Sequence, residues 1–516
     1  MLLDHLMKIL SHFALFLCLT VLSACSLPSG RTATTELAAR LESAEPADNA
    51  TVEAVVTFWQ AQVGAPESRR RLTLEEGGSR WEIDASWPAD LRFDRLVPVR
   101  PLKERELPRQ ILREGAGVPY LAVWDYSEER KKTHPFLSEG GYITPVTVTV
   151  DQRAPRRAAL RIHDPRAETS VVLAGSKKPL AADWSAVSEH ILYNGKKQKI
   201  MPGLAALRNS QKYIDKLGLL SLEPPAKDRI PVIFVHGLMS RPLTWHNAFN
   251  ELGFDPDIQK NYQLYFFRYP SGVPVVYSSA KFRQQLSLLE TELERIGNRR
   301  AKNNMVLIGH SMGGLVSKLQ VTSSGDRLWV NLFGAKPADL GLSQQEYENF
   351  KQYLEFHPNP HIDRVVFVCT PHRGSKMAVG FIGAVGRRLI SLPGNILGNT
   401  FDLLQGQERS NPVLGQMLSK GIPSSIDNLS PESTFVKQSV QLPLKPGLHV
   451  HSIIGNKDGR ALDDPKCSDG VVPYRSAHLD GVESELVVPS NHGAHETEAG
   501  IAEMRRILLL HLKQSR

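Results

Sequence analysis

The segment GHSMG at positions 309–313 fits the pattern G-x-S-x-G, and its residue types are suited to nucleophilic chemistry. In this pattern the serine stands on a sharp turn between a strand and a helix, and glycines on both sides leave room for the turn. The apolar run MVLI precedes the motif and LVSKLQ follows it, as a buried strand and a helix would. The spacing therefore predicts Ser311 as a nucleophile for covalent acyl transfer.

A serine nucleophile needs a base to take its proton and an acid to orient that base. Two histidines three positions apart, His492 and His495, stand in SNHGAH just after the apolar run ELVVP. Two acids precede them, Asp458 in GNKD and Asp469 in SDGVVP. Asp458 stands beside a glycine, so it is equally well explained as a turn residue. No His, Asp or Glu spacing is typical of a metal site, and we expect neither a metal nor an organic cofactor.

With these motifs, residues 228–516 resemble an α/β-hydrolase of the lipase and esterase type. The resemblance rests on the serine motif at 309–313 and on HGL at 236–238, directly after the run IPVIFV. It implies that the backbone N–H groups of Leu238 and Met312 form an oxyanion hole. Two such donors aimed at one point stabilise the negative oxygen of a tetrahedral intermediate. The segment TPHRGS at 370–375 also resembles a motif of these lipases, and we expect it to shape the rim of the site, with turn formation as the main role of its individual residues.

The family order of serine, acid and histidine places the acid before the last strand and the base after it. Asp469 resembles the acid of the lipase pattern Asp-Gly-x-Val, whereas Asp458 fits the looser pattern G-x-x-D, so the resemblance favours Asp469. His492 is nearer the strand end, where relatives carry their base in G-H-x-x-H, and is the predicted base. Asn491 replaces the glycine of many relatives there. We expect His495 to open the final helix or to support its neighbour.

After Asp228 strands alternate with helices, which predicts an α/β fold with a doubly wound, mostly parallel sheet. A stripe of apolar residues at helical spacing follows Ser278 and predicts an amphipathic helix. The expected strands are the apolar runs IPVIFV (230–235), QLYFFRY (263–269), MVLIG (305–309), RVVFVCT (364–370), HVHSIIG (449–455) and ELVVP (485–489).

A smaller β-rich domain is expected over 51–225, before the catalytic domain at 228–516. Short runs rich in Val, Thr and aromatic residues, separated by Gly, Pro and Asp turns, predict strands and a sandwich-like arrangement. They include TVEAVVTFW, RRLTLEE, RWEIDASW, YLAVWDY, YITPVTVTV and AALRIHD. A helix is expected around 205–219. No catalytic constellation is visible in this part of the sequence.

The amino terminus is typical of an export signal, with an apolar core at 13–22 after Lys8. Its end, LSAC, resembles the lipobox of bacterial lipoproteins, which implies cleavage after residue 24 and acylation of Cys25. Ordinary cleavage near Ala24 and an uncleaved anchor are the alternatives. Residues 25–50, with few bulky side chains, are expected to form a tether. Ser26 favours the outer membrane by analogy with Gram-negative lipoproteins.

The connection at about 375–447 is far longer than the two to six residues typical of such loops. Its apolar, glycine-broken sequence predicts a cap over an acyl pocket, although an ordinary covering layer fits equally well. The two cysteines beyond the signal, Cys369 and Cys467, are either free thiols or one disulfide, because spacing alone does not fix their geometry.

The formal net charge of +8 is spread over 516 residues and not gathered into blocks, which favours no nucleic-acid partner. Together, these features predict a membrane-tethered serine hydrolase that acts on carboxylic esters, with esters of lipid-like acyl chains as the expected substrates. A phospholipase or membrane-lipid deacylase would use the same residues. A lipoprotein that only binds the envelope, with a relict hydrolase fold, is the rival from another class. The sequence does not indicate an oligomeric state.

Overall fold

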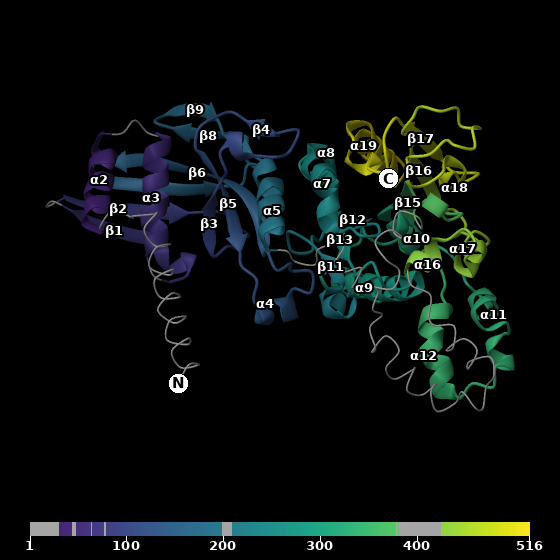
Figure 1. Ribbon diagram of the computed structural model, residues 1–516. Helices are drawn as coiled ribbons and strands as arrows, with labels where there is room; N and C mark the ends of the chain where they lie inside the picture. The colour runs from purple at the N-terminus through teal and green to yellow at the C-terminus, as the bar shows by residue number, and fades with distance from the viewer. Residues whose placement is uncertain are drawn as a thin grey trace, which may run out of the picture. The chain divides into compact units, whose positions relative to one another are not determined.

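The computed structural model describes residues 30–43, 48–62, 64–76, 79–198, 209–377, 380 and 425–515. These residues form two compact units (Figure 1). The first contains the described residues up to Val99 together with 112–123 and 145–183; the second contains 100–111, 124–144 and the chain from Trp184 onward.

The division of the chain differs from the contiguous boundary expected near 225–228. Segments 100–111 and 124–144 pack with the second unit because their polar groups are paired there. Glu139 accepts two hydrogen bonds from the Arg268 guanidinium, at 2.7 and 2.9 Å. The Glu189 carboxylate accepts the backbone N–H of Leu107 at 2.7 Å. Such long-range pairings leave no mark in local sequence patterns.

A seven-stranded sheet forms the centre of the second unit, in the order β11-β13-β12-β14-β15-β16-β17. All neighbours from β13 to β17 pair in parallel, and only the edge strand β11 is antiparallel. The six apolar runs expected as strands all lie in this sheet. The strands are β11 (Gly218–Leu220), β12 (Ile230–Val235), β13 (Tyr262–Arg268), β14 (Met305–His310), β15 (Ile362–Val368), β16 (His449–Gly455) and β17 (Ser484–Val488).

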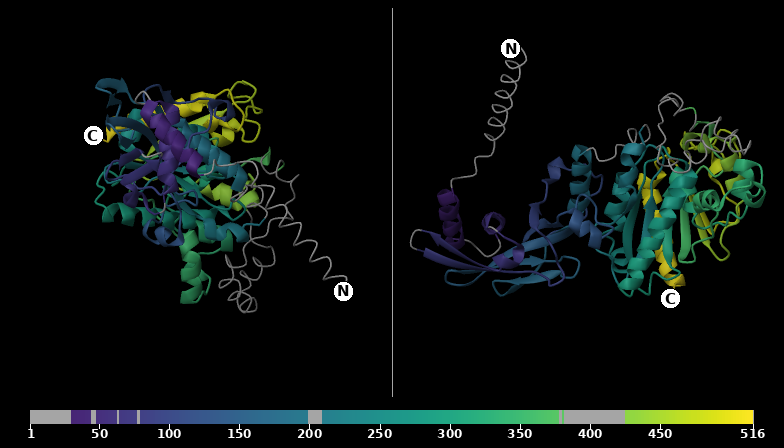
Figure 2. Two further views of the ribbon diagram at one scale, coloured as in Figure 1. Left: turned by 90° about the vertical axis from the view of Figure 1, so that its left-hand side faces the viewer. Right: turned by 90° about the horizontal axis from the view of Figure 1, so that it is seen from below.

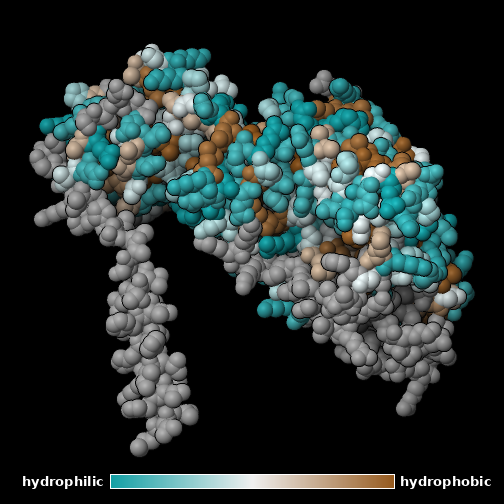
Figure 3. All heavy atoms as spheres, turned by 45° about the horizontal axis from the view of Figure 1, so that its top comes forward, coloured by the Kyte–Doolittle hydropathy of each residue, from teal (hydrophilic) through white to brown (hydrophobic). Residues whose placement is uncertain are grey.

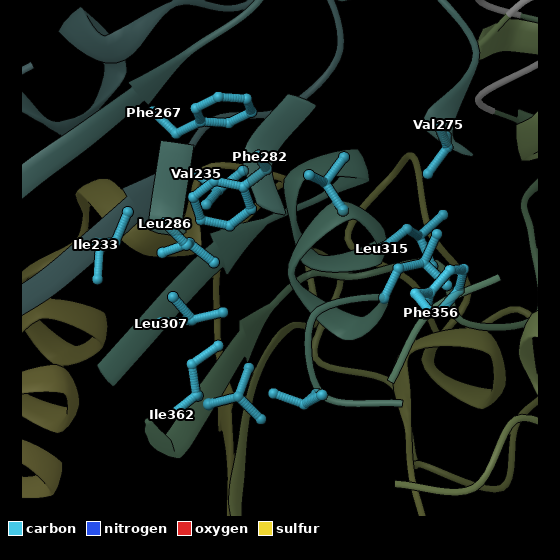
Figure 4. Packing of buried hydrophobic residues seen from close by; sticks show 14 of the residues in the cluster. Ile233, Val235, Phe267, Val275, Phe282, Leu286, Leu307, Leu315, Phe356 and Ile362 are labelled. Carbon is cyan, nitrogen blue, oxygen red and sulfur yellow. The ribbon is translucent and has the colours of Figure 1, made fainter. Parts of the chain in front are cut away.

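Helices cover both faces of this sheet, as the alternation of side chains along β12 shows. Ile233 and Val235 belong to one core cluster, which includes Phe282 and Leu286 of α9 (Figure 4). Val232 and Phe234 point to the other face and belong to a cluster with helix α19. The mostly parallel sheet between helical layers agrees with the predicted α/β class, and β11 makes it a mixed sheet.

The helices of the second unit follow the expected alternation. The helix predicted after Ser278 is α9, which buries its apolar stripe. Around 205–219, where a helix was expected, the described residues form a short 3-10 helix at Gln211–Lys216 and the strand β11. The α-helices in the described part of this unit are α4 (Glu128–Thr133), α5 (Ser185–Gln198), α7 (His246–Leu252), α8 (Pro256–Asn261), α9 (Val275–Arg295), α10 (Met312–Lys318), α11 (Arg327–Phe333), α12 (Gln344–Leu354), α16 (Ser425–Leu429), α17 (Thr434–Ser439), α18 (Tyr474–Ala477) and α19 (Glu498–Gln514).

The first unit contains one six-stranded sheet in the order β1-β2-β7-β6-β5-β3, which confirms a β-rich region before the hydrolase-like part. It is not a sandwich, because the purple helices α2 (Gly30–Ser43) and α3 (Asn49–Ala61) lie against this sheet in Figure 2. Its strands are β1 (Arg71–Glu76), β2 (Ser79–Ser86), β3 (Arg95–Pro98), β5 (Val118–Trp124), β6 (Tyr142–Ala154) and β7 (Arg157–His163). Two small ribbons pair β4 (Leu112–Arg113) with β10 (Ala182–Asp183) and β8 (Ser170–Leu173) with β9 (Ser176–Pro179).

The run TVEAVVTFW, predicted as a strand, is helical in α3, so this prediction was wrong. Asp48 caps the helix by accepting the Thr51 N–H at 3.3 Å. The buried residues Val52, Val55 and Val56 stand at helical spacing with Trp59. Packing of this face outweighs the strand preference of the β-branched residues.

Part of the expected tether at 25–50 is folded. Helix α2 buries Leu37 and Leu41 against α3 and the first sheet, so the folded chain begins earlier than the composition indicated. The predicted signal at 1–24 and the predicted acylation site Cys25 lie outside the described residues.

Both remaining cysteines, Cys369 and Cys467, are buried free thiols, so the optional disulfide is not formed. Among the helices that the structure describes, none combines the length and the apolar character that a membrane span requires. On the face drawn in Figure 3, hydrophobic residues lie in separate patches between hydrophilic ones.

Helix α9 provides a direct test of the core. Leu286 is fully buried, so Leu286→Ala should lower the free energy of unfolding by about 2 to 5 kcal/mol, through lost transfer energy and a residual cavity. Leu288→Ala on the same helix is the matched control, because Leu288 is 39% exposed and its truncation should cost little. Chemical denaturation monitored by tryptophan fluorescence measures both changes. Equal destabilisation by the two substitutions would contradict the assigned face of α9.

Candidate active site

Ser311 forms the turn between the end of β14 and the start of α10. Its backbone has φ 54° and ψ −125°, in the left-handed region that residues with a side chain rarely adopt. Such a conformation costs about 1 to 3 kcal/mol and persists only where the surrounding structure enforces it. The turn lifts the Ser311 side chain off the end of the sheet, as the motif at 309–313 predicts.

Two glycines allow this turn because their positions have no space for a side chain. A Cβ on Gly313 would lie 2.3 Å from the Val235 carbonyl oxygen and 2.4 Å from that of His236. A Cβ on Gly309 would lie 2.7 Å from the Gly313 oxygen. The first turn of α10 therefore lies directly against the end of β12, and only glycine permits this approach.

Three of the predicted site residues lie in one chain of hydrogen bonds. His492 Nε2 is 2.9 Å from Ser311 Oγ, and His492 Nδ1 is 2.7 Å from Asp469 Oδ2. An ionised carboxylate only accepts hydrogen bonds, so Nδ1 carries the proton and Nε2 is free to accept from the serine hydroxyl. This arrangement allows proton transfer from Ser311 to His492.

Asp469 is fixed by its own loop as well as by His492. Its Oδ1 accepts the N–H groups of Val471 at 2.8 Å and Val472 at 2.6 Å. Burial by itself would raise the pKa of this carboxyl group. The hydrogen bond and charge of His492, with the two backbone donors, outweigh burial and hold the pKa of Asp469 below its usual value. The carboxylate is therefore ionised at neutral pH.

Asp458 and His495, the alternative acid and the alternative base, do not belong to this chain of hydrogen bonds. Asp458 is 59% exposed and its carboxylate faces Arg460 at 3.7 Å, without a contact to either histidine. His495 is buried, its Nε2 is 2.8 Å from Thr244 Oγ1, and no hydrogen bond within the described residues joins it to Ser311. Burial, followed by the neighbouring His310, lowers the pKa of His495 well below its usual value.

His310 has a position that the sequence analysis did not anticipate. Its Nε2–H donates to the backbone carbonyl of His492 at 2.9 Å, and its ring stacks on His495 with 3.9 Å between centroids. Burial, followed by the neighbouring His492, lowers the pKa of His310 to about 3, so this ring is neutral. His310 therefore connects the serine turn to the loop of the base. The signal available in the sequence was its place as the variable residue before the serine.

The two predicted oxyanion donors lie at the same turn. Met312 is the first residue of α10, where backbone N–H groups have no partner within the helix. A Cβ on Gly237 would lie 3.0 Å from Ser311 Cβ, so the chain entering Leu238 runs directly beside the serine. In the part of the chain that the structure describes, neither N–H has a protein acceptor. Both donors are thus free to bind a substrate oxygen.

His236 holds the loop that carries Leu238. Its Nδ1–H donates to the Gly237 carbonyl at 2.9 Å, and its ring stacks on Tyr269 with 4.4 Å between centroids. The Tyr269 hydroxyl donates to the His236 carbonyl at 2.7 Å. Burial lowers the pKa of His236 to about 4. The chain directly after Leu238 is fixed as well, because the Met239 N–H donates to Ser271 Oγ at 3.0 Å.

The segment 370–375, expected at the rim, joins the serine helix to the loop of Asp469. Thr370 packs closely on Gly314: a Cβ added to Gly314 would lie 1.8 Å from Thr370 Oγ1. Ser375 Oγ donates to the Val471 carbonyl, and Ser476 Oγ donates to the Gly374 carbonyl at 2.6 Å. The segment therefore positions the acid loop against the sheet.

Cys369, Asp469 and His492 place one possible metal-binding atom each within 4.8 Å of one another. Burial, followed by the charge of Asp469, raises the pKa of the Cys369 thiol well above its usual value. Metals bind the thiolate, and the Asp469 and His492 atoms are already bonded to each other. These residues therefore fit a hydrogen-bonded catalytic group better than a metal centre.

Comparison with known families gives one match. Residues 226–328 match the family model of the PGAP1-like alpha/beta domain, a fold of the α/β-hydrolase type. The matched range includes Ser311 and the HGL segment at 236–238, but neither Asp469 nor His492. A search of curated proteins finds no match for this chain.

Among solved structures, this chain is similar to the mature form of lipase BlEst2 from Bacillus licheniformis, with 17% identity and a TM-score of 0.33 over 57% of this chain and 97% of that one. A lipase-esterase related protein from Clostridium acetobutylicum gives 14% identity and a TM-score of 0.29, over 56% and 98%. Phospholipase PlaB from Legionella pneumophila gives 18% identity and a TM-score of 0.29, over 49% and 45%.

The close approach at Gly313 can be tested through stability. Gly313→Ala should lower the free energy of unfolding by several kcal/mol, because its Cβ would meet two backbone carbonyls at 2.3 and 2.4 Å. Gly140→Ala is the control: an added Cβ would meet only Ser138 Oγ, at 3.6 Å. Thermal unfolding of both variants distinguishes the sites. A Gly313→Ala protein as stable as the wild type would contradict this geometry.

Proposed function

We propose that this protein is a serine hydrolase that cleaves carboxylic esters, with lipid-like acyl esters at the bacterial cell envelope as its substrates. The observation that carries the proposal is the hydrogen-bonded chain from Ser311 through His492 to Asp469, with the serine on a strained turn. The match of residues 226–328 to a domain of α/β-hydrolase type supports the same class of chemistry.

The acylation half of the reaction follows from this geometry. Ser311 Oγ attacks the ester carbonyl carbon while His492 Nε2 takes the hydroxyl proton. Asp469, ionised and hydrogen-bonded to Nδ1, stabilises the imidazolium that forms. The carbonyl oxygen becomes an oxyanion that accepts the N–H groups of Leu238 and Met312. Collapse of the intermediate breaks the ester bond, and the imidazolium gives its proton to the departing alkoxide.

The deacylation half uses the same groups in reverse roles. Water enters beside His492, which removes its proton as the oxygen attacks the acyl group on Ser311. A second tetrahedral intermediate places its oxyanion on the same two N–H groups. When it collapses, the carboxylic acid is released and the proton returns from His492 to Ser311 Oγ. No cofactor is needed for either half.

The lipid-like acyl group is proposed from the apolar sequence of the 375–447 insertion, whose described end lies beside the site. Ile426 of α16 is 1% exposed and packs on Leu238 and Met239, beside the oxyanion donors. Asn428 anchors this helix by accepting the Val275 N–H at 3.0 Å. The described end of the insertion therefore packs apolar residues against the loop of Leu238, so the insertion reaches the site. Residues 381–424, in the middle of the proposed cap, lie outside the described residues.

The envelope location is proposed from the amino terminus alone. The LSAC box would bear an acyl group on Cys25, and Ser26 favours the outer membrane. A lipid anchor of this kind would hold the enzyme at a surface rich in ester-linked lipids.

A direct test compares variants of the site residues in ester turnover. Ser311→Ala and His492→Ala should each lower kcat for a p-nitrophenyl ester by about 10³-fold or more, and the double variant should be little worse. Only proteins with Ser311 should react with a fluorophosphonate probe. Wild-type protein that neither turns over esters nor takes the probe would support the rival of a purely binding lipoprotein.

The same assay separates the two acids and the two histidines. Asp469→Asn should lower kcat by about 10³-fold or more because the amide no longer holds the base in its productive tautomer. Asp458→Asn is the matched control and should retain near-normal turnover, since its carboxylate is exposed. A loss of turnover in Asp458→Asn, or in His495→Ala but not His492→Ala, would reassign the roles.

Acylation of Cys25 can be tested in cells. Radioactive palmitate should label the wild-type protein but not Cys25→Ser, because the thiol is the acceptor in a lipobox. Cys369→Ser serves as the control and should remain labelled, since Cys369 is buried far along the chain. Equal labelling of wild type and Cys25→Ser would remove the lipoprotein from the proposal.

A further inference from the structure

A pocket of about 620 Å³ lies between the loop that follows β15 and the loop that carries Asp469. One wall comes from residues 373–377 and the other from residues 465–476, with Pro431 between them. Figure 1 shows α18, which belongs to the second wall, beside β16. Ser476 joins the walls: its Oγ donates to Gly374 O at 2.6 Å and accepts the Arg373 N–H at 3.2 Å.

The charged residues that line this pocket are all cations: Arg373, Lys376, Lys466 and Arg475. Lys376, Lys466 and Arg475 are exposed, and no described carboxylate lies within ion-pair distance of any of them. The guanidinium of Arg373 donates to backbone carbonyls, those of Arg475 at 3.1 Å and His478 at 2.5 Å. Arg373 is thus held in place without being neutralised.

The nearest acids are engaged elsewhere. Asp464 pairs with Arg460 at 3.2 Å, and its other oxygen accepts the backbone N–H of Lys466 at 2.8 Å. Glu432 faces Lys437 at 3.4 Å. Asp464 also interacts with the Lys466 charge, so these acids balance the positive charge of the pocket only in part.

Two basic side chains, Lys318 and His372, lie buried behind Arg373. Lys318 is buried at the end of α10, and burial together with the Arg373 charge lowers its pKa to about 8. Burial, followed by the Lys318 charge, lowers the pKa of His372 well below its usual value, and neither ring nitrogen has a hydrogen-bond partner among the described residues. The charges of Lys318 and Arg373 thus lie behind this wall and favour an anion in the pocket.

The pocket lies beside two loops that support the candidate active site. Ser468 lines it and directly precedes Asp469. The loop that holds Arg373 and Lys376 begins at Thr370, which packs on Gly314 of the serine helix. Both loops follow strands at the carboxyl end of the parallel sheet, where Ser311 also stands.

We propose that this basic pocket binds a phosphate group in the head of the ester substrate, so that the enzyme prefers anionic phospholipids to neutral esters of the same acyl length. The inference rests on the proposed function. A phosphate has several acceptor oxygens, which match the donors of Lys376, Lys466 and Arg475. Arginine and lysine are the usual partners of phosphate in proteins.

The experiment compares substrates that differ only in the head group. The full chain is assayed in nonionic detergent micelles with dioctanoyl phosphatidic acid, dioctanoyl phosphatidylcholine or dioctanoylglycerol at the same low mole fraction. The wild type should have the highest kcat/KM for phosphatidic acid. In Lys466→Gln/Arg475→Gln this value should fall by about tenfold through KM, because charge-assisted hydrogen bonds are lost, whereas dioctanoylglycerol turnover should stay unchanged.

The matched control is Lys260→Gln/Lys302→Gln. Both lysines are exposed and belong to the same unit. They precede the amino ends of β13 and β14, whereas Ser311 follows the carboxyl end of β14. The net-charge change is identical, so an effect of overall charge on micelle binding would occur in both double variants. Equal losses in the two would overturn the proposal.

The remaining outcomes separate this inference from the proposed function. If wild-type protein hydrolyses dioctanoylglycerol as fast as phosphatidic acid, and the pocket variant changes neither, the phosphate site is refuted while the esterase stands. If inorganic phosphate inhibits the wild type competitively without any head-group preference, the pocket takes a free anion and the substrate assignment is overturned. If no ester is cleaved and Ser311 does not react with a fluorophosphonate, the proposed function itself fails.

Discussion

The contact between the first turn of α10 and the end of β12 is the constraint on which the site depends. Because Gly313 lies against the carbonyls of Val235 and His236, the chain has to turn sharply at Ser311, with φ 54°. The same contact places the N–H of Met312 and the chain entering Leu238 around the serine side chain. One close backbone approach thus aligns the proposed nucleophile and both proposed oxyanion donors, and the surrounding core compensates for the strain.

Electrostatics at the site follow from burial. The histidines around the base are held neutral, since burial lowers the pKa of His310 to about 3 and that of His236 to about 4. Asp469 stays ionised because backbone donors and His492 outweigh its burial. The stabilising charge is therefore concentrated on one carboxylate, which faces the one ring able to exchange a proton with Ser311. The neutral ring of His310 is hydrogen-bonded to the His492 carbonyl and stacked on His495, so it fixes the position of His492 without adding a charge.

The sequence predicted elements whose signal is local. Continuous apolar runs identified the parallel strands. The spacing of glycines identified the turn at Ser311, because the steric requirements of that turn involve only the five residues 309–313. The sequence analysis failed where tertiary packing decides: α3 is helical although its Val and Thr residues prefer strands, and the three-residue strand β11 is too short to have a period. Segment 124–144 belongs to the second unit through pairings such as Arg268 with Glu139, which no local pattern records. The stacking of His310 on His495 was missed for the same reason.

The basic pocket explains how an anionic substrate and an ionised acid could share adjacent loops. Two unit charges 4 Å apart interact by about 1 kcal/mol in water and by more in a partly buried site, so a phosphate near Asp469 would be repelled. Asp469 is only 2% exposed, and its oxygens are bonded to His492, Val471 and Val472, which reduces its field outside the loop. The cations begin at Lys466, three residues before this acid, and oppose the remaining repulsion. Burying the acid and exposing the cations lets one loop orient the base and attract a phosphate.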